Sequence, residues 1–202
     1  MKFGDSRGDV LPSFTALHTV ILRLHNDLAD KLRQVNPRWN DEKLYQEARK
    51  IVGGVLQHIT YTQFLNALLG FGNDVTVSQE GLHVHTYDPQ VDGSIDLVFS
   101  TAAYRLHTYV SPMQELYNEN LELVKVFLLR DVFHKPMKMI EEDSFDCLIR
   151  GLAKQPMGQF DNKFTTEMTE FLFARPENKF GLGWLLPSIN RYRGVLFQVL
   201  IA

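Results

Sequence analysis

The sequence predicts a mainly α-helical protein. Two long runs of apolar residues repeat at steps of three and four, as one face of an α-helix does, and turn residues mark the end of each run. A chain of 202 residues with 45% hydrophobic and 22% charged residues is long enough for one domain or two small ones. We therefore expect a packed core that is built mostly from helices.

The first predicted helix covers residues 13–34. Its apolar face is formed by Phe14, Leu17, Ile21, Leu24, Leu28, Leu32 and Val35. Asn36-Pro37 ends this helix, because the residue before a proline is pushed out of the helical region.

A second and longer helix is expected to begin after Asn40, which is a favourable N-cap residue. Asp41 and Glu42 follow in the first turn, where the helix dipole favours acidic side chains. The apolar stripe continues to residue 69, and Gly70 takes the usual position after a helix end. The pair Gly53-Gly54 interrupts the stripe, which predicts either a close neighbour or a bend at that point.

The remaining elements are expected to be shorter. Residues 71–97 contain several turn signals, such as Gly72-Asn73-Asp74 and Asp92-Gly93, and predict a connection without its own core. Helical patterns return at residues 99–110, 121–130, 143–154 with Asp143 or Ser144 as the cap, and 161–173. The final run, 195–202, is apolar throughout and fits either a buried helical turn or a strand.

Charge and cysteine content exclude several classes of protein. The 21 Lys and Arg residues against 24 Asp and Glu residues give a net charge of −3, which does not favour a nucleic-acid partner. Cys147 is the single cysteine, so no intrachain disulfide can form. Residues 1–11 carry charges where a signal peptide would be apolar, and no stretch is long enough to span a membrane.

Most of the seven histidines favour an ordinary structural role. His18, His25 and His58 lie beside apolar helical positions, and we expect half-buried hydrogen-bonding side chains there. His83 and His85 lie two apart in a strand-like run, so both would point to one side, and Asp88 and Asp92 could add oxygen ligands. This pattern supports only a weak hypothesis of a metal site. Two histidines do not make a site, and the spacing matches no standard zinc or EF-hand pattern.

His107 is a stronger candidate because it comes after a stretch of small residues, 101–103, that would let a flat group approach the backbone. An imidazole on such a face can ligate iron, and Arg105 could pair with carboxylates of the bound group. The alternative is an arginine–histidine pair on a solvated helix face. Phosphate-binding glycine motifs are absent, and acidic neighbours make Cys147 a poor nucleophile, so nothing supports a hydrolase.

A resemblance appears when the motifs are taken in order along the chain. They include Gly4-Asp5-Ser6-Arg7, Leu17-His18-Thr19, His25-Asn26, Asn36-Pro37, residues 44–52, Tyr87-Asp88-Pro89, Arg150-Gly151-Leu152 with Gln155-Pro156, and Leu186-Pro187-Ser188-Ile189-Asn190. In this order the chain resembles the animal haem peroxidase family over residues 1–193. The resemblance implies a mainly α-helical core around a b-type haem, and reduction of hydrogen peroxide with oxidation of a small electron donor.

The resemblance also implies roles for particular residues. Arg7 corresponds to the family's distal arginine, which stabilises negative charge that develops on the peroxide. His107 corresponds to the proximal iron ligand, and Asn190 to the asparagine that holds that imidazole by a hydrogen bond. Arg105 and Arg193 correspond to the arginines beside the haem propionates.

The chain departs from the family pattern at four places. The distal histidine, with its adjoining calcium-binding aspartate, lies upstream of the Gly-Asp-x-Arg motif, so calcium ligands are not expected in this chain. Val10 replaces a glutamate that forms a haem ester in some members. The glycine before the proximal histidine is missing, so that Arg105 and His107 are two apart instead of three. Deleting one residue from a helix rotates every later residue by about 100°, so either the backbone absorbs the slip or His107 turns away from the iron.

The fourth departure is the tail, because residues 194–202 resemble nothing in the family. The sequence therefore predicts a partial peroxidase domain over residues 1–193, truncated at both ends, with a divergent apolar tail. Family membership implies an extracellular or secreted protein with oxidative-stress, host-defence or matrix chemistry. The alternative is a non-catalytic fragment or a helical binding piece that lacks the distal histidine.

Overall fold

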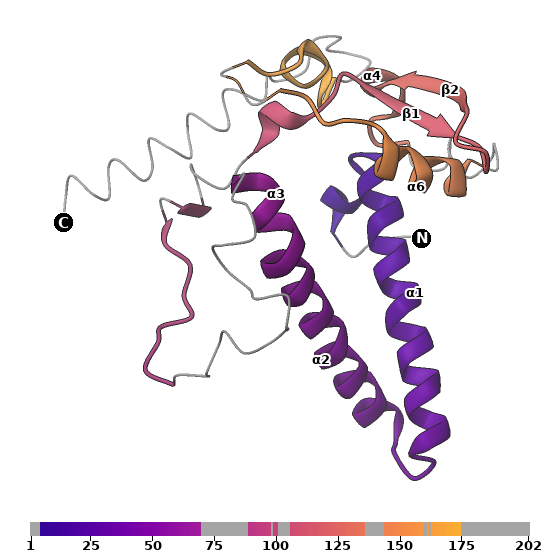
Figure 1. The fold of residues 1–202 in the computed structure, drawn as a ribbon, viewed down its shortest axis with the longest axis vertical. Coiled ribbons are helices and arrows are strands. Elements are labelled where there is room, and N and C mark those ends of the chain that lie inside the picture. The colour runs from indigo at the N-terminus through magenta and orange to yellow at the C-terminus, as the bar shows by residue number, and fades with distance from the viewer. Residues whose placement is uncertain are drawn as a thin grey trace. The chain divides into compact units, whose positions relative to one another are not determined.

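The computed structural model describes residues 5–69, 89–97, 99–100, 106–135, 144–159, 161 and 163–174. These residues fall into two compact units, whose bounds are Met1–His18 with Ser94–Ala202 and Thr19–Gly93. Helices dominate, as the sequence predicts, and the two long ones are the most prominent features of Figure 1.

The first long helix, α1, spans Pro12–Val35 and confirms the helix predicted over residues 13–34. Pro12 occupies the first helical position, where its fixed φ angle fits and its missing N–H is no loss. The Thr15 hydroxyl donates a hydrogen bond of 2.9 Å to the Gly8 carbonyl and so ties the preceding 3₁₀ turn η1, Ser6–Asp9, to the helix. The helix stops before Asn36-Pro37, as expected.

The second long helix, α2, spans Asp41–Ile59. Asn40 is its N-cap, and the side-chain oxygen accepts a hydrogen bond of 2.9 Å from the Lys43 backbone N–H, which confirms the predicted start. The helical backbone continues through a π-helical segment, η2, at Thr60–Phe64 into α3 at Leu65–Leu69. The predicted extent of the helix, to residue 69, is therefore confirmed.

The glycine pair in α2 does not mark a close neighbour in the part of the chain that the structure describes. No described atom lies within 4 Å of a Cβ placed at Gly53 or Gly54. The irregularity in this helix lies further along, at η2, because a π-helical turn inserts an extra residue into the hydrogen-bond ladder.

A β-hairpin replaces the helix that we expected at residues 121–130, and that prediction was wrong. Strands β1, Met113–Tyr117, and β2, Leu123–Leu128, pair antiparallel with Met113 opposite Leu128. The Asn118 side chain accepts hydrogen bonds from two backbone N–H groups and closes the turn, and the β-branched residues Val124 and Val126 suit a strand that pairs with β1. Only Leu129–Val132 forms a helical turn, α4.

The helix α6 spans Phe145–Lys154 and begins directly after Ser144, as predicted. The last predicted helix, residues 161–173, was too long, because the regular part is a short π-helical segment, η5, at Glu167–Phe171. The helix expected at residues 99–110 is only partly within the described residues, and its end forms a 3₁₀ turn, η4, at His107–Tyr109.

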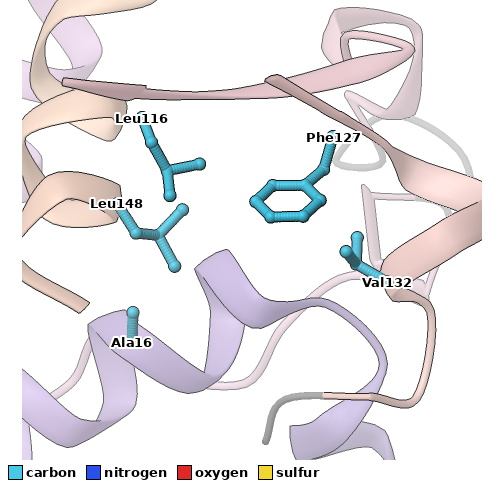
Figure 2. Packing of buried hydrophobic residues seen from close by; sticks show 5 residues of the cluster. All are labelled: Ala16, Leu116, Phe127, Val132 and Leu148. Carbon is cyan, nitrogen blue, oxygen red and sulfur yellow. The ribbon is translucent and has the colours of Figure 1, made fainter. Parts of the chain in front are cut away.

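Two apolar clusters form the core of the first unit. One brings together Ala16 of α1, Leu116 of β1, Phe127 of β2, Val132 of α4 and Leu148 of α6. Figure 2 shows these five side chains directed into one common space. The second cluster joins Leu129, Phe133, Met168 and Leu172. Residues far apart in the sequence therefore hold the hairpin, α6 and the start of α1 together.

Candidate functional site

The predicted iron ligand, His107, opens the 3₁₀ turn η4. Two backbone hydrogen bonds close this turn, from the Tyr109 N–H to the Leu106 carbonyl at 3.1 Å and from the Val110 N–H to the His107 carbonyl at 3.2 Å. The residue is half-buried, and its Nδ1 atom is buried. Protein atoms thus enclose Nδ1, and an imidazole in this arrangement would bind iron through its other nitrogen, Nε2.

Leu106, the residue before His107, adopts a left-handed backbone conformation with φ 48° and ψ 19°. Such a conformation costs a side-chain-bearing residue about 1–2 kcal/mol, and glycine adopts it freely. The chain is therefore not α-helical at the step from Leu106 to His107. The expected rotation of about 100° rested on a continuing helix, so that premise was wrong.

The loop after α6 holds the His107 turn. The Gly158 N–H donates a hydrogen bond of 2.8 Å to the Tyr109 carbonyl. The Gln155 amide donates to the Ser111 hydroxyl at 3.1 Å and to the Met113 carbonyl at 2.9 Å, and its oxygen accepts from the Glu115 N–H at 3.0 Å. The sequence showed Gln155 only as part of a motif, without a role.

A pocket of about 270 Å³ lies beside this loop. Its walls include Leu11, Tyr109, Leu129, Leu152 and Met157, with Gln155 among the polar groups. His107 does not line it, and the volume is below the range of about 300–1,000 Å³ that is typical of ligand sites. The pocket that the described residues enclose therefore does not include the candidate iron ligand.

The other predicted site residues are placed less fully. The backbone of Arg7 lies in η1. The carbonyl of the next residue, Gly8, accepts the hydrogen bond from the Thr15 hydroxyl of α1. Arg105, Asn190 and Arg193 lie outside the described residues. The structure thus places one of the five predicted side chains, that of His107, and the grouping of the full set stays a prediction.

The ordinary role predicted for three other histidines is confirmed in part. His25 is half-buried, with Nε2 3.3 Å from the Tyr45 carbonyl and its ring 5.2 Å from the Tyr45 ring. His18 is exposed but has Nδ1 2.8 Å from the Phe14 carbonyl oxygen. His58 is exposed on α2, so half-burial was wrong for His18 and His58.

The metal hypothesis at His83 and His85 falls outside the described residues, as does Asp88. Within the described ranges, no three His, Cys, Asp or Glu side chains lie close enough to hold a metal ion. Among the helices that the structure describes, none combines the length and apolar character needed to cross a bilayer.

Sequence reasoning missed an ion pair beside the second apolar cluster, in which the Glu167 side chain is buried and the Arg130 side chain is 39% exposed. Both carboxylate oxygens of Glu167 accept hydrogen bonds from Arg130 Nε, at 2.8 and 2.9 Å, and one accepts from the Arg130 backbone N–H at 2.9 Å. Burial of Glu167 opposes its charge, but these hydrogen bonds prevail and hold the pKa of the carboxyl below its ordinary value. The Arg130 guanidinium also lies over the Phe171 ring, 3.8 Å from its centre.

Known proteins match this chain over nearly its whole length. The family model for animal haem peroxidase matches residues 1–195. The chain is 36% identical to peroxidasin and to chorion peroxidase of Drosophila melanogaster, in each case over 95% of its length, and 36% identical to human myeloperoxidase over 94%.

A solved structure agrees with these sequence matches. Peroxidase A from Dictyostelium discoideum superposes with a TM-score of 0.80 at 29% identity and covers 95% of this chain. The chain spans only part of these proteins: 12% of the peroxidasin, 24% of the chorion peroxidase, 25% of myeloperoxidase and 35% of the solved chain. The match over nearly the whole sequence, in a mainly helical fold, shows that the chain belongs to the animal haem peroxidase family.

Proposed function

We propose that the protein reduces hydrogen peroxide and oxidises a small electron donor, with a b-type haem held by His107. The observation that carries this proposal is the family match over residues 1–195, and the half-buried imidazole of His107, the residue that the family pattern assigns as the ligand, supports it. Haem, when bound, supplies the iron at which peroxide is reduced.

Each of the predicted site residues would have a separate task. The buried Nδ1 of His107 leaves Nε2 as the nitrogen for the iron, and Asn190 would hold the Nδ1 side by a hydrogen bond. Arg7 would stabilise negative charge on the peroxide oxygen, because a guanidinium stays protonated and donates several hydrogen bonds. Arg105 and Arg193 would pair with the propionate carboxylates.

The same resemblance supports an extracellular setting and a domain boundary near Arg193, where the family match ends within two residues. Residues 194–202 would then form a tail outside the family pattern. The family resemblance implies oxidative-stress, host-defence or extracellular-matrix chemistry as the setting of the donor oxidation.

The ligand assignment is tested on the purified protein supplied with haem. We expect an absorption spectrum of histidine-ligated ferric haem, which His107→Ala abolishes and His58→Ala, on the exposed face of α2, leaves unchanged. A His107→Ala variant with the wild-type spectrum would overturn the assignment. Because the spectrum reports ligation directly, the test does not depend on peroxidase turnover.

A further inference from the structure

We propose that the loop Gln155–Gly158, which comes directly after α6, is a clamp that orients His107, with Gln155 and Gly158 as positioning residues. This inference rests on the proposed role of His107 as the iron ligand. The two residues do not touch that imidazole. They act through the backbone instead. Gly158 contacts the η4 turn that carries His107, and Gln155 contacts the segment that runs from this turn into β1.

Gln155 joins three points of that segment. Its amide nitrogen donates to the Ser111 hydroxyl and to the Met113 carbonyl, and its amide oxygen accepts from the Glu115 N–H. These partners lie 40 to 44 residues away in the sequence, so the hydrogen bonds are tertiary and belong to no helix or strand ladder. One side chain therefore fixes the segment 111–115, which leads directly out of the His107 turn.

Gly158 fixes the turn itself. Its N–H donates to the Tyr109 carbonyl, and a Cβ at this position would lie 3.2 Å from the carbonyl oxygens of both Thr108 and Tyr109. A side chain here would push against two peptide groups of η4. Close approach of the loop to the turn thus depends on glycine at this position.

The position of α6 is in turn set by its packing against β1. Gly151 lies so close to this strand that a Cβ would overlap the Glu115 carbonyl oxygen. The loop therefore starts from a helix that is fixed on the hairpin, and it reaches the turn after only a few residues. Rigid support of this kind is what a metal ligand needs, because small displacements of the ligand weaken the bond.

The clamp is tested first without haem, by hydrogen exchange of the peptide that covers residues 106–112. We expect Gln155→Met, which keeps the side-chain volume but removes the amide, and Gly158→Ala each to speed exchange in this peptide about tenfold. Gly53→Ala is the matched control, because its Cβ meets no described atom within 4 Å, and it should leave this peptide unchanged. Equal exchange in the wild type and all three variants would overturn the clamp.

The second test concerns the iron ligand. With haem added, Gln155→Met and Gly158→Ala should weaken haem affinity by about 10- to 100-fold and lower the fraction with the histidine-ligated spectrum. In a His107→Ala background the same two changes should have no further effect on the spectrum, because the group that they orient is gone. A change in melting temperature alone, with unaltered spectrum and affinity, would reduce both residues to a purely structural role and overturn the proposal.

The outcomes separate the clamp from the function on which it rests. If His107→Ala keeps the wild-type spectrum, the ligand assignment fails whatever the loop variants do. If His107→Ala loses the spectrum while both loop variants retain wild-type affinity, the clamp fails and the proposed function stands. If far-UV circular dichroism shows that one variant does not fold, Ser111→Ala replaces it. This change removes the hydrogen bond from the Gln155 amide to the Ser111 hydroxyl, the contact of Gln155 that lies nearest to the His107 turn. It leaves the hydrogen bonds to Met113 and Glu115 in place and should also lower affinity; wild-type affinity in this variant would overturn the clamp.

Discussion

The two compact units differ in how their apolar residues are used. In the first, five elements that are distant in the sequence place side chains in one buried cluster. In the second, the buried apolar side chains among the described residues are Leu44, Ala48 and Val52, and all three lie on α2. Large apolar side chains stay exposed in both units, for example Leu22 at 43% in the second and Leu123 at 53% in the first. Tertiary packing between several elements therefore holds the first unit, whereas the buried side chains of the second come from one helix, whose start is held by the Asn40 cap.

The largest difference is expected for the same substitution made in each unit. Leu148→Ala removes a side chain that is 1% exposed in the centre of the first cluster, and should lower the free energy of unfolding by about 2–5 kcal/mol. Leu22→Ala, on an exposed face of α1, should change it by less than about 0.5 kcal/mol. Urea denaturation followed by circular dichroism measures both. Similar losses in the two variants would contradict the proposed difference between the units.

Two glycines, Gly151 in the first unit and Gly53 in the second, sharpen the same comparison. Gly151→Ala forces a methyl group onto the Glu115 carbonyl and should destabilise the first unit by about 1–3 kcal/mol. Gly53→Ala has open space and a helical backbone, so it should stabilise α2 by about 0.5–1 kcal/mol. Opposite signs in a denaturant titration are the expected result, and a loss in both variants would show that Gly53 has an unseen packing role.

The pairing of buried Glu167 with Arg130 makes the first unit sensitive to acid. Because the folded-state pKa of Glu167 lies below the ordinary value of 4.5, its carboxylate stabilises the fold fully above that pH. This stabilisation is lost as the pH falls through the lowered pKa. Glu167→Gln should cost about 1–3 kcal/mol at pH 7 and flatten the fall in stability below pH 4.5.

Melting temperatures between pH 3 and pH 7, compared with those of the wild type, check the acid dependence of Glu167→Gln. Glu47→Gln is the matched control, because Glu47 pairs with Lys50 in the second unit and the lysine side chain is 71% exposed. An exposed pair of this kind contributes little, so the control should keep the wild-type acid dependence. A variant at Glu167 with the same slope as the wild type would show that another carboxylate governs acid unfolding.

The smallest effect is expected at Leu106. Leu106→Gly removes the strain of the left-handed conformation but adds flexibility to the unfolded chain. The free energy of unfolding should therefore rise by only about 0.5 kcal/mol. Leu11→Gly, a change at the residue that precedes α1, should instead be destabilising, because its side chain packs on the second cluster. Calorimetry of both variants gives the comparison. If Leu106→Gly lowers the free energy of unfolding, the packing of the leucine side chain stabilises the fold by more than the left-handed backbone destabilises it.

Much of the helical part of the fold could be predicted from the sequence. The start of α2 at Asn40 and the end of α1 before Pro37 are governed by rules that involve a few neighbouring residues. The hairpin was missed because residues 121–130 contain apolar positions that fit a helical repeat as well as a strand. Pairing with β1 decided between the two, and that pairing is not visible within the segment itself.

The candidate site could be predicted only as a set of residues. His107 was found through its motif, but its 3₁₀ turn and the conformation of Leu106 were not, since the motif suggested a continuing helix. Gln155 and Glu167 carried no local signal of their roles. Their partners lie 37 to 44 residues away, and only chain folding brings such distant groups within hydrogen-bond distance.

By itself, the sequence determined the family, the two long helices and the identity of the proposed ligand, because motifs, caps and helical repeats act over short stretches of chain. The tertiary structure decided the hairpin, the pairing of buried Glu167 with Arg130, and the hydrogen bonds from Gln155 and Gly158 to the His107 turn and the segment after it. The physical reason is that buried polar groups must find hydrogen-bond partners wherever the folded chain offers them.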